Sequence, residues 1–130
     1  DILINNAGLM SKNWKETVDV NFTAVIDCTF VAMDYMGKHK GGKGGTIVNI
    51  SSAVGLALHP SIPVYTATKH GVIGFSLCMQ ANYAKTGVRF LTLCPGKTKS
   101  KMASEFYATK YDFVDQKVDL ELWERFPTQE

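Results

Sequence analysis

The chain has 130 residues, which is enough for one modest globular domain. Its hydrophobic share of 45% and charged share of 20% are ordinary for a soluble domain. The net charge of +2 is too small to favour nucleic acid or an anionic membrane as a partner. No apolar stretch reaches the roughly 18 residues of a membrane-spanning helix.

The cysteines and histidines give no sign of a disulfide framework or a metal site. Three cysteines are an odd number, and no Cys-x-x-Cys occurs among Cys28, Cys78 and Cys94. The three histidines also lack the spacing of metal ligands. We therefore expect no metal, and buried thiols in a reducing compartment. The chain opens on a strand-like run without a basic segment before it, so we expect a cytoplasmic protein and not a secreted one.

The first half of the chain predicts a strand, a helix and a second strand. Residues 1–4 form a short apolar run that turn-forming residues end, as in a buried strand. Apolar residues recur at helical spacing over residues 14–35. The glycine- and lysine-rich residues 37–45 predict a loop, and the β-branched residues 46–50 predict a second buried strand. The loop resembles a phosphate-binding loop, but it leads from helix to strand, so we interpret it as a plain connection.

The second half repeats the same alternation. Residues 51–63 contain Gly55, Pro60 and Pro63 and predict a loop. A long helix is expected over residues 65–84 with a C-cap at Gly87, then a strand over residues 89–93. A less regular helical pattern follows residue 100. Such alternation predicts an α/β fold, a parallel sheet with helices on both faces.

All three predicted strands end in small or polar residues. These clusters are Asn5–Gly8, Ser51–Ser52 and Pro95–Thr98. Ligands of parallel α/β sheets bind beyond the carboxyl ends of the strands. We therefore expect a ligand site at this edge of the sheet.

A tyrosine and a lysine stand one helical turn apart near this edge. Tyr65 and Lys69 share a helix face because they are four residues apart. An ammonium group close to a phenol favours the phenolate and lowers the phenol pKa from about 10. A tyrosine of that kind can act as an acid or a base, and Ser52 can donate a hydrogen bond to a substrate oxygen. Alone, such a pair is more often an ordinary surface pair than a catalytic one.

Several motifs together resemble the short-chain dehydrogenase/reductase family in order and spacing. They are Asn5-Asn6-Ala7-Gly8 after a strand, Asn21 in the next helix, Ile47 to Ser52, Tyr65-x-x-x-Lys69, and Pro95-Gly96. The resemblance extends from Asp1 to about Ser100. Within the family the chain looks most similar to NAD-dependent 15-hydroxyprostaglandin dehydrogenases and insect alcohol dehydrogenase-like proteins. The residues that carry this likeness include Lys12-Asn13-Trp14, Met33 to Met36, Pro63-Val64, His70-Gly71, Gly87 to Arg89 and Cys94.

The resemblance implies a role for each matching position. Tyr65 would be the general acid/base, Ser52 would orient the substrate oxygen, and Lys69 would lower the pKa of the phenol and bind the nicotinamide ribose. Asn21 would hold a water that relays protons to Lys69. The implied cofactor-binding residues are Asn5, Ala7, Gly8, Tyr65, Lys69, Pro95, Gly96 and Thr98.

The resemblance also implies the ligands and the assembly. The cofactor would be NAD, with NADP left open because no residue that selects between them is present. The substrate would be a small secondary alcohol or ketone, contacted by Ser52, Ile62 and Tyr65. Ile62 stands where the prostaglandin-oxidising relatives carry a glutamine, which favours a smaller or more apolar alcohol. The family's habit of pairing helices predicts a homodimer or homotetramer of the full-length protein.

The sequence looks like the C-terminal half of a three-layer, Rossmann-like, doubly wound sheet. Residues 1–130 would form a partial family domain, and residues 101–130 would form a substrate lid. No glycine-rich cofactor turn is present, and a final strand is missing as well, so we expect a fragment that is inactive alone. Two other interpretations stay open: a family member that performs epimerisation or dehydration, and a non-catalytic binding or oligomerisation scaffold. The complete Asn21, Ser52, Tyr65 and Lys69 set favours the dehydrogenase over the scaffold.

Overall fold

The computed structural model describes residues 1–102, 111–115, 117, 121, 128 and 129. Three parallel strands form its centre in the order β1-β2-β3. They span Ile2–Asn5, Gly45–Ile50 and Val88–Leu93. The expected parallel α/β sheet is confirmed, and each predicted strand lies within one residue of its predicted bounds at either end. A further parallel pair joins β4 (Lys97–Thr98) to β5 (Thr128–Gln129).

The helix expected between the first two strands is divided by a π-helical turn. It comprises α1 (Trp14–Val18), the π turn η1 (Asp19–Thr23) and α2 (Ala24–Met36). The predicted loop after it includes a short 3-10 turn, η2 (Lys38–Lys40), and connects α2 to β2. The stretch therefore leads from helix to strand, as the sequence predicts.

The second crossover carries the longest helix. A 3-10 turn, η3 (Ala53–Gly55), follows β2, and α3 spans Pro63–Gln80. Proline is favoured in the first turn of a helix, because the N–H group that it lacks would have no partner within the helix there. Pro63 therefore lets α3 begin two residues before the predicted start at residue 65. The short α4 (Tyr83–Thr86) ends at Gly87, whose positive φ of 64° confirms the predicted C-cap.

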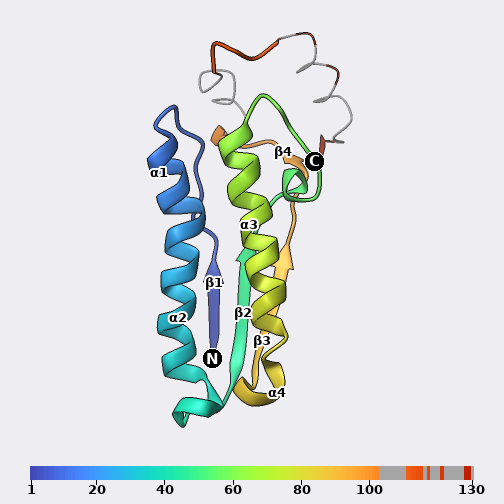
Figure 1. The fold of residues 1–130 in the computed structure, drawn as a ribbon. Helices are drawn as coiled ribbons and strands as arrows, with labels where there is room; N and C mark the ends of the chain where they lie inside the picture. Colours follow the sequence, from blue (N-terminus) through green and yellow to red (C-terminus); the bar gives the residue numbers. More distant parts are fainter. Residues whose placement is uncertain (103–110, 116, 118–120, 122–127, 130) are drawn as a thin grey trace.

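Figure 1 shows α2 and α3 running alongside the strands on one face of the sheet. Two right-handed crossovers that advance in the order β1-β2-β3 place both helices on the same side. Both helices of the described residues lie on one face, so these residues make up two layers of the expected three-layer, Rossmann-like sheet. The other face bears Ile2, Ile4, Leu91 and Leu93, which are all at least 49% exposed.

The main core lies between the sheet and its helix layer. Its buried members are Met33, Met36, Ile47, Val88 and Phe90. The expectation of buried thiols is wrong for Cys28 and Cys78, which are exposed, while Cys94 is half-buried. Cys28 shares the outward face of α2 with Val31 and Tyr35 at helical spacing, and that face is directed away from the sheet.

The last part of the chain contributes little to the described structure. Most of residues 101–130 lies outside the described residues, so their role as a lid stays a prediction. Among the residues that the structure describes, no helix combines the length and the apolar character needed to cross a membrane.

Candidate active site

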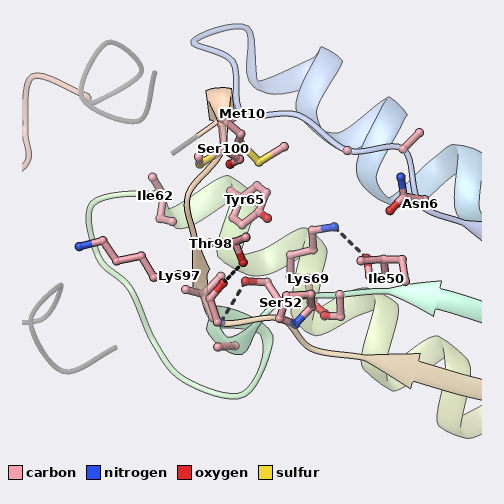
Figure 2. A pocket seen from close by; sticks show the side chains of 18 residues that line it. Asn6, Met10, Ile50, Ser52, Ile62, Tyr65, Lys69, Lys97, Thr98 and Ser100 are labelled. Carbon is pink, nitrogen blue, oxygen red and sulfur yellow. Dashed lines mark hydrogen bonds between the residues drawn. The ribbon is translucent and has the colours of Figure 1, made fainter. Parts of the chain in front are cut away.

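A cavity of about 490 Å³ opens at the carboxyl edge of the three-stranded sheet (Figure 2). Segments that follow all three strands line it: Asn6–Gly8 after β1, Ser51–Ser52 after β2, and Pro95–Thr98 after β3. The polar strand ends therefore meet at one site, as the sequence predicts. The other lining residues are Met10, Ile50, Ala53, Val54, Ile62, Tyr65, Lys69, Ser100 and Met102.

Tyr65 and Lys69 enter the cavity from the first turns of α3. The Lys69 Nζ lies 5.5 Å from the centroid of the Tyr65 ring. It also donates a hydrogen bond of 2.9 Å to the backbone oxygen of Ile50, at the end of β2. The Ser51 hydroxyl donates to the backbone oxygen of Lys69 at 2.8 Å. The end of β2 thus holds both the backbone and the ammonium group of Lys69.

Burial dominates the acid–base properties of this pair. It raises the pKa of Tyr65 above the ordinary 10.0, and a hydrogen bond with Ser52 offsets part of that rise. Burial also lowers the pKa of Lys69 from 10.5 to about 8, against an opposing Coulomb effect of Cys94. The expectation that the pKa of Tyr65 lies below its ordinary value is therefore wrong for this structure. The cost of burying a phenolate outweighs the favourable interactions around it.

Ser52 stands where β2 turns into η3. As the N-cap residue, its Oγ accepts a hydrogen bond from the backbone N–H of Val54 at 3.3 Å. Serine is preferred at an N-cap because its hydroxyl oxygen accepts a hydrogen bond from a backbone N–H that would otherwise have no partner within the turn. Its hydroxyl also reaches the Tyr65 phenol. The turn therefore holds the hydroxyl in place beside the phenol.

Asn21 lies on the π turn and is completely buried. Its amide bonds both backbone groups of Leu9: Nδ2 donates to the oxygen and Oδ1 accepts from the nitrogen, each at 2.8 Å. A Cβ added at Gly8 would lie 3.5 Å from both Asn21 Oδ1 and Lys69 Nζ. The segment that Asn21 holds therefore passes within contact distance of the Lys69 ammonium group.

Asn5 lies outside the cavity lining, in contrast to the other residues expected to meet the cofactor. Its Nδ2 donates to Asn49 Oδ1 at 2.8 Å and to Thr29 Oγ1 at 3.3 Å, and Asn49 Nδ2 donates to Ser76 Oγ at 2.8 Å. This buried row of hydrogen bonds links α2, β1, β2 and α3. Asn5 therefore stabilises the sheet that carries the site.

Met10 and Val54 are lining residues that the sequence did not single out. Both belong to a small apolar cluster in which Val54 and Ile62 are buried and Met10 and Tyr65 pack against them. Met10 and Val54 stand in irregular or 3-10 segments, where no helical or strand periodicity marks a side chain as inward-facing. The sequence carries no clear signal for either residue.

Known proteins match both the sequence and the structure of this chain. The sequence profile of the short chain dehydrogenase family matches residues 1–110. The 15-hydroxyprostaglandin dehydrogenase [NAD(+)] of Rattus norvegicus is 50% identical over 103 residues, which cover 77% of this chain and 39% of that protein. Alcohol dehydrogenase 1 of Ceratitis cosyra is 40% identical over 116 residues, covering 87% of this chain and 45% of that protein.

Among solved structures, that of a 4-hydroxyisoleucine dehydrogenase complexed with NADH is similar to this chain in both fold and sequence. It has a TM-score of 0.65 and 32% identity, and the match covers 78% of this chain and 48% of that one. The chain thus spans less than half the length of these relatives. The match extends over the predicted motifs, and the chain belongs to the short-chain dehydrogenase family.

Proposed function

We propose that the complete protein is an NAD-dependent oxidoreductase that interconverts a secondary alcohol and a ketone, with Tyr65 as its general acid/base. One observation carries the proposal: the Tyr65 phenol, the Ser52 hydroxyl and the Lys69 ammonium group line one cavity at the carboxyl edge of the sheet. Relatives named for NAD or for alcohol dehydrogenase activity support the choice of cofactor and reaction.

The residues present fit the nicotinamide-ribose end of such a cofactor. The space that a Cβ at Gly8 would enter borders the Lys69 ammonium group. Ala7 and Gly8 after β1, and Pro95, Gly96 and Thr98 after β3, line the same cavity. We infer that these residues hold the dinucleotide and that Lys69 donates hydrogen bonds to its ribose. The chemistry that a nicotinamide supplies is hydride transfer.

Proton transfer at the substrate oxygen is the task of the protein. In the reductive direction the Tyr65 hydroxyl donates its proton to the ketone oxygen, and Ser52 donates a hydrogen bond to the same atom. The raised pKa of Tyr65 keeps the phenol protonated at neutral pH, which suits this direction. In the oxidative direction the Tyr65 phenolate, whose negative charge the Lys69 ammonium group stabilises, accepts the hydroxyl proton of the alcohol. Asn21 holds the backbone of Leu9, in the segment that faces Lys69. This arrangement supports transfer of that proton from Lys69 through a water molecule.

The test is Tyr65→Phe in the full-length protein, with Tyr83→Phe as its control. Tyr83 is 44% exposed on α4 and does not line the cavity. NADH formation from secondary alcohols is expected to fall by about 10²–10⁴-fold in Tyr65→Phe, because a positioned acid/base contributes that much. Circular dichroism should be unchanged in both variants. A Tyr65→Phe variant that keeps most of its activity would refute the proposal and leave a non-catalytic scaffold as the better interpretation.

We also propose that the full-length protein self-associates through the outer faces of α2 and α3. Phe30, Val31, Tyr35 and Leu77 are all at least 52% exposed there. Apolar patches of this kind mark interaction surfaces in soluble proteins. Analytical ultracentrifugation should give a dimer or a tetramer, and a monomer at all accessible concentrations would contradict the proposal.

A further inference from the structure

A second, much smaller cavity lies behind one wall of the candidate active site. Its volume is about 10 Å³, against about 490 Å³ for the main cavity. Met10, Ile62 and Tyr65 line both spaces. These three side chains therefore form the partition between the two cavities, directly beside the phenol that is proposed to meet the substrate oxygen. A space of this size holds at most about one water molecule.

Met10 is the member of the partition that can change without disturbing the rest of the site. Tyr65 is the proposed acid/base, and Ile62 is buried in the cluster at the start of α3. Met10 is half-buried, packs against that cluster, and lies on the segment between β1 and α1 (Figure 2). Its unbranched side chain is long and adaptable.

The backbone on both sides of Met10 is held by hydrogen bonds. Asn21 bonds both backbone groups of Leu9 at 2.8 Å, and the Ser11 N–H donates to Thr17 Oγ1 at 3.2 Å. Asn21 and Thr17 are themselves almost completely buried. A shorter side chain at Met10 would therefore leave open space, because the surrounding chain cannot collapse freely into it.

The wall that contains Met10 has the chemistry of an alkyl-binding surface. Met10, Val54 and Ile62 carry no charge and form one apolar cluster with the Tyr65 ring. Lys97 also lines the main cavity, but Figure 2 shows its side chain extended away from Tyr65. The substituent of the alcohol that packs against this wall is therefore expected to be apolar and uncharged.

We propose, on the basis of the proposed function, that Met10 determines substrate specificity by limiting the length of this apolar substituent. The Met10 side chain closes the main cavity towards the smaller one. Without it, the two spaces join, and a longer alkyl chain can extend past Tyr65 towards Val64 and Tyr111, which line the far cavity. The proposal thus assigns a substrate class, uncharged secondary alcohols with one alkyl arm of limited length, and names the residue that sets the limit.

The experiment compares full-length wild-type protein with Met10→Ala, Met10→Phe and the control Met79→Ala. Met79 packs against the main core and lines neither cavity, so its truncation reports the general effect of losing a methionine side chain. The probes are a homologous series of unbranched secondary alcohols, assayed for kcat/KM with NAD and titrated calorimetrically without turnover. Circular dichroism verifies that each variant is folded, and Met10→Val replaces Met10→Ala if the latter does not fold.

In Met10→Ala, the ratio of kcat/KM for long alcohols to kcat/KM for short alcohols is expected to rise about tenfold or more. The reason is that one methylene group, accepted or excluded by an apolar pocket, changes kcat/KM by about 10–200-fold. It should fall in Met10→Phe and stay unchanged in Met79→Ala. A folded Met10→Ala with the wild-type chain-length profile would overturn the proposal. If no variant oxidises any alcohol, the proposed function fails, and the calorimetric affinities for the same series then decide whether Met10 limits chain length.

Discussion

Replacing Lys69 by methionine is expected to stabilise the folded protein at neutral pH while it removes a proposed catalytic group. Lys69 is only 4% exposed, and its pKa is lowered from 10.5 to about 8, mainly because burial disfavours the charged form. The difference of about 2.5 between the unfolded and folded pKa values of Lys69 corresponds to ~3 kcal/mol. The free energy of unfolding is lower by this amount when Lys69 is protonated in both states. Methionine has a similar length and carries no charge.

The lost hydrogen bond reduces this gain. Lys69 Nζ donates to the backbone oxygen of Ile50 at 2.9 Å, and methionine cannot replace that donor. Such a bond contributes about 1 kcal/mol. The net increase in the free energy of unfolding at neutral pH is therefore expected to be ~2 kcal/mol. A residue that lowers stability in exchange for function is common at active sites.

The effect has a definite dependence on pH. Between about pH 8 and 10.5 the folded wild-type protein releases the Lys69 proton while the unfolded chain still binds it. The free energy of unfolding of the wild type therefore rises with pH across this window relative to that of Lys69→Met. The advantage of the variant should be largest below about pH 8 and close to zero near about pH 10.

Urea denaturation of the full-length protein without cofactor, at about pH 7 and about pH 10, measures both values. Lys85→Met is a suitable control, because Lys85 is exposed on the short helix α4. Its stability relative to the wild type should change little between the two conditions. A Lys69→Met variant that is less stable than the wild type by the same amount at both pH values would refute the conclusion that burial of the cation dominates.

Two further predictions concern the framework of the site. Asn49→Ala removes the partner that the Asn5 and Ser76 side chains share in the buried row, and urea denaturation should show a loss of about 2–4 kcal/mol. A loss below about 0.5 kcal/mol would mean that these hydrogen bonds contribute little. Gly44 and Gly41 both have positive φ, but only at Gly44 would a Cβ meet a neighbour, the Gly87 oxygen at 2.5 Å. Gly44→Ala should therefore lower Tm more than Gly41→Ala, which carries about 1–2 kcal/mol of backbone strain alone, and equal losses would contradict this.

Much of the fold could be predicted because its local signals agree. Short β-branched runs between turn residues correspond to β1, β2 and β3, and Pro63 and Gly87 mark real boundaries. The π turn could not be predicted in the same way. It places Asn21 so that its amide bonds both backbone groups of Leu9, 12 residues away along the chain. Hydrophobic periodicity contains no information about such a distant partner.

Solvent exposure was harder to predict than secondary structure. Cysteine is among the residue types most often buried, yet Cys28 is exposed. Phe30 is one of the apolar residues that recur at helical spacing in the predicted helix, and it is exposed as well. The sheet covers only one side of each helix. Which apolar side chains face the sheet depends on how the helix is rotated against it, and the extra residue of the π turn changes that rotation.

The sequence by itself determined which of the proposed catalytic side chains meet. Ser52 follows a strand, and Tyr65 and Lys69 share one helix face, so the parallel topology is enough to bring them to one edge of the sheet. Only the tertiary structure decided how deeply they are buried and what surrounds them. The raised pKa of Tyr65, the lowered pKa of Lys69 and the apolar partition at Met10 all depend on segments that are distant in the chain and packed together in space. Desolvation and cavity shape are properties of that packing, which residue spacing along the chain does not encode.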